Sequence, residues 1–322
     1  MAFDRSRLPG SRLPRRGQSP AVNPTSSSSA IVAGMGRKSI GVYIASALAL
    51  SWLLQLAAIR FWGLNTGGAD LILLATMWSP TLLALIFIAV HRPARSGVLW
   101  RLGRLRYLPL GVAVETAIAF AMVAILAGAA VATMGWFAFE RTGVTVHGGP
   151  WLLGAGFQIW PFYVLNIAVT AAAFSVFGLV AATGEEFAWR GFLQGHLISQ
   201  VGVRRGILLI AAVWWAWHLP GLLAGYNFPE YPIVGALILF PLQMIGAALF
   251  FGWLTLRSKS FWPAALAHAA VNSVQQGVIN NLVATVPTLY IDGLRTALIV
   301  AVGLACWASL GRDENRSTAK GA

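Results

Sequence analysis

Eight apolar runs of about 20 residues each recur along this chain from residue 40 onward. A helix needs roughly 20 apolar residues to cross the ~30 Å hydrocarbon core of a membrane. The chain is 57% hydrophobic and only 10% charged, whereas soluble domains carry about 25% charged residues. The runs therefore predict an all-α fold, a polytopic membrane helix bundle of about eight transmembrane helices. These predicted spans lie near residues 40–59, 71–90, 108–134, 160–184, 206–225, 232–256, 261–283 and 289–310.

The basic residues alternate along the chain in a way that predicts an orientation for the bundle. Of the 23 Lys and Arg residues, 19 lie in the two tails and in the connections that follow an even number of spans. Because cytoplasmic segments carry an excess of Lys and Arg, both termini are expected in the cytoplasm and the protein in the cell membrane, as a multi-pass protein. The same distribution accounts for the net charge of +13. The lipid bilayer is thus an expected partner, and nucleic acid is not.

The chain divides into one membrane domain and two polar ends. Residues 1–38 are rich in Arg, Pro and Ser and predict a disordered basic cytoplasmic tail. Residues 39–311 hold the spans, and residues 312–322 are expected to form a short cytoplasmic tail. The longest expected connection has about 25 residues, too short for a soluble catalytic domain. Cys306 is the only cysteine, so an intrachain disulfide is excluded.

Few ionisable or amide side chains interrupt the spans. A charged side chain near the bilayer centre costs about 3 kcal/mol or more, so such residues are candidates for function. They occur in three segments, EEFAWR in the fourth run, VWWAWHLP in the fifth and ALAHAAVNSVQQ in the seventh. The candidates in these segments are Glu185, Glu186, Arg190, His218, His268 and Asn272.

Helical spacing relates the candidates to one another. Glu186 and Arg190 are four residues apart, which predicts an ion pair on one helix face. Glu185 lies about 100° around the helix from its neighbour and is therefore left free by that pair. His268 and Asn272 are also four apart, so the seventh helix has a polar face inside the membrane.

The depths of the candidates in the membrane are also compatible. His218 and His268 lie thirteen and nine residues beyond the basic residues that precede their runs, or about 20 and 14 Å from the predicted cytoplasmic surface. Glu185 reaches this level if its helix starts later than residue 160 or is tilted, and continues as one helix to about residue 200.

Each candidate also has an ordinary structural explanation. A buried ion pair accounts for Glu186 and Arg190, packing accounts for His218, and interhelical hydrogen bonding accounts for Asn272. These explanations do not account for the gathering of all the candidates on three helices at compatible depth.

Other polar residues are assigned structural positions. Glu115 is expected to reach the membrane interface, and Asp292 and Arg295 are expected to pair at the start of the last span. Three further histidines are expected in loops or on an amphipathic flank, namely His91, His147 and His196.

The three segments, in this order, resemble the motifs of a known family. EEFAWR resembles EExxxR, WWAWH resembles FxxxH, and HAAVN resembles HxxxN of the CAAX-protease and bacteriocin-processing (CPBP, or Abi) intramembrane proteases, which include the Ras-converting CAAX endopeptidase. The resemblance covers residues 160–283, approximately. It departs from the family pattern at Trp214, where the second motif has Phe.

The resemblance implies an intramembrane endopeptidase that acts on a peptide or membrane-protein substrate. By position, Glu185 would activate the attacking water with help from His218, and His268 with Asn272 would stabilise the oxyanion. Glu186 and Arg190 would be supporting residues. The side-chain chemistry agrees, because a carboxylate with an imidazole can serve as the base and N–H donors can stabilise an oxyanion.

The use of a metal is left open by the sequence. Glu185, His218 and His268 are the residues that would hold a zinc ion if one is present. Asn272 is a poor zinc ligand and the HExxH spacing is absent, so no cofactor is favoured and zinc is kept as the alternative.

Two other functions are compatible with the same residues. A proton-coupled transporter could use them as a proton relay, and it predicts substrate flux without cleavage. A catalytically silent scaffold or immunity protein could keep the fold without the chemistry, although the intact motifs count against it. The favoured interpretation is an endopeptidase whose cavity is open to the cytoplasm, with no substrate named by the sequence.

Overall fold

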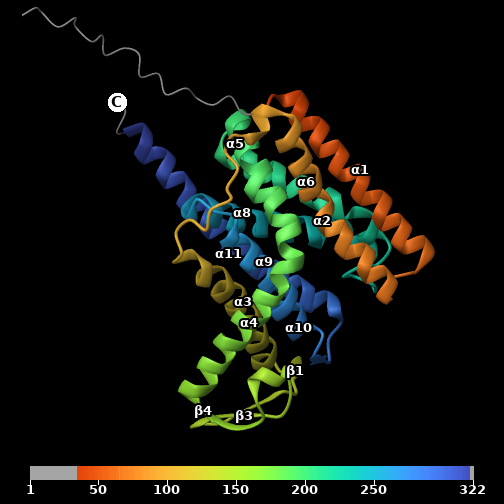
Figure 1. Ribbon diagram of the computed structural model, residues 1–322. Coiled ribbons are helices and arrows are strands. Elements are labelled where there is room, and N and C mark those ends of the chain that lie inside the picture. Colours follow the sequence, from red (N-terminus) through yellow and green to blue (C-terminus); the bar gives the residue numbers. More distant parts are fainter. Residues whose placement is uncertain (1–34, 65, 320–322) are drawn as a thin grey trace, which may run out of the picture. The chain divides into compact units, whose positions relative to one another are not determined.

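The computed structural model describes residues 35–64 and 66–319, and Figure 1 shows how their helices are arranged. Most of the predicted basic tail, residues 1–38, lies outside the described residues, as do the last three residues of the predicted C-terminal tail. All the described residues belong to one compact unit.

Every predicted apolar run forms helix. Seven helices of the described chain are long and apolar enough to cross a membrane, which makes this an all-α polytopic bundle and a multi-pass membrane protein. These seven apolar helices contain the elements α1 (Arg37–Phe61), α2 (Gly67–Val90), α3 (Tyr107–Gly128), α4 (Trp160–Glu186), α6 (Val203–Leu223), α8 (Phe240–Ser258) and α11 (Thr288–Ala319). Two short segments, α7 (Pro232–Val234) and the π-helical η4 (Gly235–Leu239), lead directly into α8.

The seventh predicted run is the exception among the eight expected spans. It forms α9 (Trp262–Ala270), the π-helical η5 (Val271–Gln275) and α10 (Gln276–Ile279), and it is not among the seven apolar helices. This segment contains His268, Asn272 and two glutamines, and α9 packs against α3, α4 and α8. Neighbouring helices therefore surround most of it, so it does not need the apolarity of a lipid-facing span.

The helix that holds the two glutamates is much longer than one span. α4 continues through the π-helical η3 (Phe187–Leu193) into α5 (Gln194–Val201), so the predicted continuation to about residue 200 is confirmed. The suggested later start is wrong, because α4 begins at Trp160. At 1.5 Å per residue the 42-residue helical segment is about 63 Å long, roughly twice the hydrocarbon thickness. This length lets Glu185 lie far from the first residue of α4.

The connection between α3 and α4 contains strands that the sequence analysis did not predict. β1 (Ala132–Met134) pairs with β5 (Leu282–Ala284), whereas β2 (Phe137–Phe139), β3 (Gly143–Val146) and β4 (Gly156–Ile159) form a second antiparallel sheet. In Figure 1 the labelled strands gather at the end of α3 and α4 that is far from α5. The predicted ends of the third and seventh runs, at 134 and 283, are therefore wrong. Apolar strand residues continue the hydrophobic pattern, and short apolar runs do not separate strand from helix.

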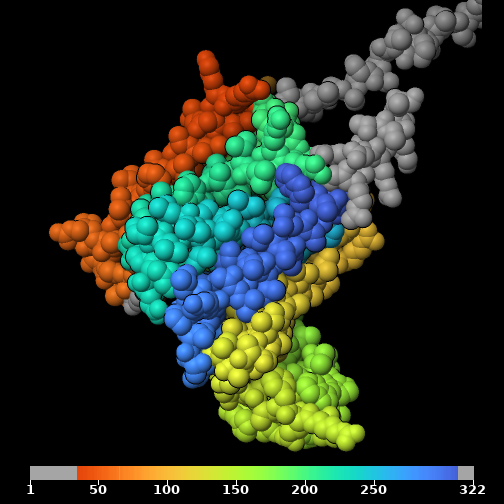
Figure 2. All heavy atoms as spheres, turned by 180° about the vertical axis from the view of Figure 1, so that it is seen from behind, coloured from red at the N-terminus to blue at the C-terminus, as the bar shows by residue number. Residues whose placement is uncertain are grey.

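Helix α11 packs closely on α8. A Cβ built on Gly303 would lie 2.6 Å from the Cα of Gly246, so neither position has room for a side chain. Small residues let membrane helices approach in this way, and Gln243 of α8 also donates a hydrogen bond to Thr296 of α11 at 2.9 Å. Figure 2 shows α11 in blue lying along the face of the bundle. This packing fixes the position of the residues on the first turns of α11.

Candidate active site

The four predicted catalytic residues line one cavity of about 260 Å³. Glu185 comes from the end of α4, His218 from α6, His268 from α9 and Asn272 from η5. Glu185 and His268 are buried, whereas Asn272 is exposed towards the cavity. The structure therefore brings together residues that are up to 87 positions apart in the chain.

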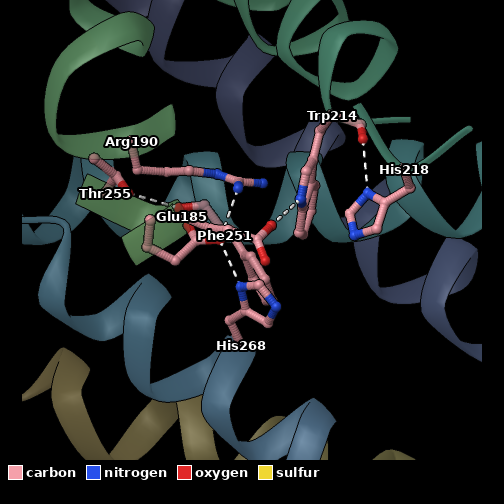
Figure 3. A network of polar contacts seen from close by, with 8 residues as sticks. Glu185, Arg190, Trp214, His218, Phe251, Thr255 and His268 are labelled. Atoms are coloured by element: carbon pink, nitrogen blue, oxygen red, sulfur yellow. Dashed lines mark hydrogen bonds and ion pairs between the residues drawn. The ribbon is translucent and has the colours of Figure 1, made fainter. Parts of the chain in front are cut away.

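Glu185 is held on one side by the tryptophan that departs from the family motif. Trp214 Nε1 donates a hydrogen bond to Glu185 Oε2 at 2.7 Å, as Figure 3 shows. The side chain of Glu185 is 1% exposed and makes no other hydrogen bond within the described part of the chain. Its second oxygen is thus available to a ligand in the cavity.

His218 has its tautomer fixed by the backbone of its own helix. Its Nδ1 lies 2.8 Å from the carbonyl oxygen of Trp214. A carbonyl oxygen only accepts, so Nδ1 must carry the proton and Nε2 of the neutral ring is left as an acceptor. The ring packs edge-on against Trp217 and Phe240, with centroids 4.6 and 4.9 Å away.

Next to this histidine, a side chain of α1 bonds the backbone of α6 on both sides of a proline. Pro220 lies inside the helix, and the following amide of Gly221 donates to Gln55 Oε1 at 2.9 Å. Gln55 Nε2 in turn donates to the carbonyl oxygen of Trp217 at 2.6 Å. Both ends of the glutamine side chain are thus bonded to the backbone of α6, and the Ala216 carbonyl, which has no helical donor at Pro220, accepts from Trp52 Nε1 at 2.8 Å. The glutamine supports the turn of α6 that carries the histidine.

The predicted ion pair of the fourth run is present and has a third member. Glu186 Oε1 accepts from Arg190 Nη1 at 2.8 Å and lies 2.9 Å from His268 Nδ1. Glu186 and Arg190 are both fully buried. The Arg190 guanidinium also lies 4.2 Å from the centre of the Trp214 ring. The sequence spacing indicated the pair, but it did not indicate the bond to His268, which joins residues 82 positions apart.

A close contact between two helices explains why a glycine precedes the two glutamates. A Cβ built on Gly184 would lie 2.8 Å from the carbonyl oxygen of Met77 on α2. Glycine therefore allows α4 to approach α2 at the level of the cavity.

Glu115 and Arg295 also line the cavity and belong to a second polar group, for which the predicted positions are wrong. Glu115 of α3 is 3% exposed and accepts a hydrogen bond from Gln275 Nε2, so it does not reach the interface. Arg295 Nε donates to Gln275 Oε1 at 3.2 Å. Asp292 accepts from the hydroxyl of Tyr231 instead of pairing with Arg295. These contacts join distant helices, and the i,i+3 spacing on α11 gave no sign of them.

The remaining histidines divide. His91 and His147 lie in connections, as expected. His196 is buried on α5, where Nδ1 accepts from the backbone amide of Met35 at 3.3 Å and Nε2 lies 3.4 Å from the carbonyl oxygen of Ala94. His196 therefore lies on a short amphipathic helix, as expected, but on its buried face.

The candidate ligands for a zinc ion are Glu185, His218 and His268. A catalytic zinc site has three protein ligands and an open position. Within the described ranges, no three His, Cys, Asp or Glu side chains lie close enough together to hold a metal ion. As placed, Glu185, His218 and His268 do not fit a three-ligand site, and zinc stays the untested alternative to a mechanism without a cofactor.

Residues 165–274 match the family model described as type II CAAX prenyl endopeptidase Rce1-like. This match supports the resemblance of the three motifs to those of the CAAX-protease family. It runs from α4 to η5 and includes the three motifs on which the resemblance depends. No curated protein matches the chain with significance. At the level of the family, the match supports a membrane-embedded protease that acts on a peptide substrate.

Less than half of the chain is covered by this match. Glu115, Gln275 and Arg295, which are hydrogen-bonded to one another, lie outside it. So does Gln55, whose hydrogen bonds to α6 reach into the matched segment. These contacts are features of this structure that the family match does not describe.

Proposed function

We propose that this protein is an intramembrane endopeptidase in which Glu185 is the general base for the attacking water. The observation that carries the proposal is the shared cavity, which is lined by a buried carboxylate, two imidazoles and an amide from three parts of the chain. Peptide hydrolysis needs a base for water and donors for the developing negative charge. These four side chains can supply both.

Glu185 and His218 would act on the water. Trp214 holds one carboxylate oxygen of Glu185, and the other can accept a proton as the water oxygen attacks the peptide carbonyl. His218 offers Nε2 as an acceptor for the second hydrogen of the same water, because its Nδ1 donates to the helix backbone. Glu185 then returns the proton to the departing amine, which completes the hydrolysis.

His268 and Asn272 would stabilise the oxyanion. His268 Nδ1 already donates to Glu186, so Nε2 can donate only when the ring is an imidazolium. Glu186 gives that positive charge a carboxylate partner. The amide nitrogen of Asn272 is the second donor. Arg190, bonded to the same carboxylate oxygen, would keep Glu186 in place.

The cavity is proposed to open to the cytoplasm, on the basis of the basic residues in the even-numbered connections. No step of this mechanism uses a metal, because the three candidate ligands do not fit one in this arrangement. Zinc remains the alternative that an experiment must test.

The test uses the full chain in detergent micelles with a library of internally quenched peptides. We expect Glu185→Gln to abolish cleavage while thermal stability is retained, because the amide is nearly isosteric but cannot take a proton from water. Glu230→Gln, at an exposed position, is the matched control and should cleave normally. A strong chelator should leave the rate of the unsubstituted protein unchanged. Inhibition by the chelator with recovery on adding Zn²⁺ would instead support the metal alternative.

Undiminished cleavage by Glu185→Gln would contradict the proposal and favour the transporter or scaffold interpretations. Flux measurements in proteoliposomes would then separate these two.

A further inference from the structure

Arg295 lines the same cavity as the proposed catalytic residues, from the side of α11. The residue is 8% exposed, so a positive charge is placed in the interior of a membrane protein. Its Nε donates to Gln275, and the other end of that amide donates to Glu115. This chain of contacts, from Glu115 through Gln275 to Arg295, fixes the plane of the guanidinium.

The two terminal nitrogens of Arg295 lack a hydrogen-bond partner among the residues that the structure describes. In the same part of the chain, no carboxylate lies at ion-pairing distance from the guanidinium, although the carboxylates of Asp292 and Glu115 interact with it electrostatically from farther away. A guanidinium has five N–H groups, of which only one is used here. A buried charge is costly unless it is paired and hydrogen-bonded.

The outer edge of a guanidinium matches a carboxylate, which it binds through two parallel N–H···O bonds. We propose that Arg295 binds a carboxylate group of the peptide substrate and thereby selects where the chain is cut. This inference rests on the proposed peptidase function and adds the chemistry of the recognised group. The carboxylate is either the free C-terminus of the substrate or an Asp or Glu side chain near the scissile bond.

The size of the cavity limits the distance between the two sites. Its volume of about 260 Å³ lies just below the range of about 300–1,000 Å³ that is usual for ligand pockets. Arg295 and Glu185 both line it, so the recognised carboxylate and the cleaved bond must lie within a short segment of the substrate. Since α11 is fixed by its packing on α8, the guanidinium is positioned before the substrate binds.

Binding can be measured separately from cleavage with the Glu185→Gln full chain. The probes are dansyl-capped hexapeptides of random uncharged sequence, because the dansyl group has no carboxylate. One pool ends in a free carboxylate, a second in a carboxamide, and a third is a carboxamide with one internal Glu. We expect one of the carboxylate-bearing pools to bind about 10- to 100-fold more tightly than the uncharged carboxamide, by fluorescence anisotropy.

The pool that is preferred identifies the source of the carboxylate. Preference for the first pool indicates the C-terminus, and preference for the third indicates a side chain. Adding Arg295→Gln should remove the preference, whereas Arg141→Gln removes the same charge from an exposed loop and should retain it.

Equal binding of the three pools, or no binding of any, would overturn the proposal, and this comparison needs no Arg295 variant. A preference that survives Arg295→Gln would also overturn it. Binding to Glu185→Gln is measured without cleavage. If Glu185→Gln preferred a carboxylate but the unsubstituted protein never hydrolysed a peptide, the peptidase proposal would be refuted and the Arg295 site would remain.

Discussion

Two arginines are buried in the bundle, and they differ in the partners of their charge. Arg190 has a carboxylate partner 2.8 Å away and an indole ring 4.2 Å from its guanidinium carbon. Among the described residues each guanidinium makes one hydrogen bond, and that of Arg295 goes to the neutral amide of Gln275. Two further nitrogens of Arg190, Nε and Nη2, are buried without a hydrogen-bond partner. The two arginines therefore differ in the partner they have: the charge of Arg190 faces a carboxylate of the protein itself, whereas Arg295 lines the cavity, where we propose that a substrate carboxylate binds.

The largest expected effect concerns Arg190, the arginine with a direct carboxylate partner. Arg190→Ala leaves Glu186 buried with His268 as its remaining partner, and breaking a buried pair typically costs about 3–5 kcal/mol. We expect a lower thermal denaturation temperature and lost activity. Arg295→Ala should be less destabilising, because it removes a charge with no direct carboxylate partner. If Arg190→Ala and the unsubstituted protein had the same thermal denaturation temperature, the ion pair of Arg190 would not stabilise the fold, which would contradict this comparison.

The next effect distinguishes the proposed oxyanion donor Asn272 from Arg295 by their kinetic constants. Asn272→Ala removes one proposed oxyanion donor, and the loss of such a donor in other enzymes lowers kcat by about 10²–10³. We expect KM to change little, whereas Arg295→Gln should mainly raise KM. Steady-state rates on the quenched peptides provide both constants. A change in kcat alone for Arg295→Gln would mean that Arg295 acts in the catalytic step and not in substrate binding.

A smaller effect is expected at the proline-containing turn beside His218. Gln55→Leu removes the side-chain bonds to the Gly221 amide and the Trp217 carbonyl and allows the histidine turn to shift. Misplacement of a catalytic group by about 1 Å can cost about 10²-fold in rate, so we expect a loss in kcat of that order or less. Ser51→Ala, which removes a neighbouring 3.2 Å bond to the same carbonyl, is the matched control. If both variants lose activity equally, Gln55 has no special role.

The smallest effect is expected at the departure from the family motif. Trp214→Phe restores the family's residue type but removes the 2.7 Å bond to Glu185, and a hydrogen bond to a charged group contributes about 1.5–3 kcal/mol. The family's phenylalanine lacks this donor, so other groups must be able to hold the glutamate. We therefore expect activity to fall but remain measurable in a direct comparison of rates. Complete inactivity would show that this chain depends on the indole.

The parts of the site that could be predicted from the sequence are those with a local or motif-based signal. The i,i+4 spacing indicated the Glu186–Arg190 pair, and three motifs in apolar helices indicated the four residues that line the cavity. The contacts of Gln55 with Trp217 and of Glu115 with Gln275 join residues 162 and 160 positions apart, and helical periodicity cannot indicate which distant faces meet. For the same reason Glu115 and Arg295 were assigned to interface and local pairing.

The fold shows a similar division. Long apolar runs predicted the helices, because membrane thickness fixes their length. The strands at residues 132–134 and 282–284 are stabilised by pairing with each other, a contact between positions that no single run could reveal.

The most direct test of the account follows the water oxygen. The unsubstituted protein and Glu185→Gln are incubated with the same peptides in H₂¹⁸O, and the products are examined by mass spectrometry. The account predicts one ¹⁸O atom in each new C-terminal carboxylate made by the unsubstituted protein, and no such product from Glu185→Gln. Labelled products that form equally in both proteins would contradict the assignment of Glu185 as the base that activates water.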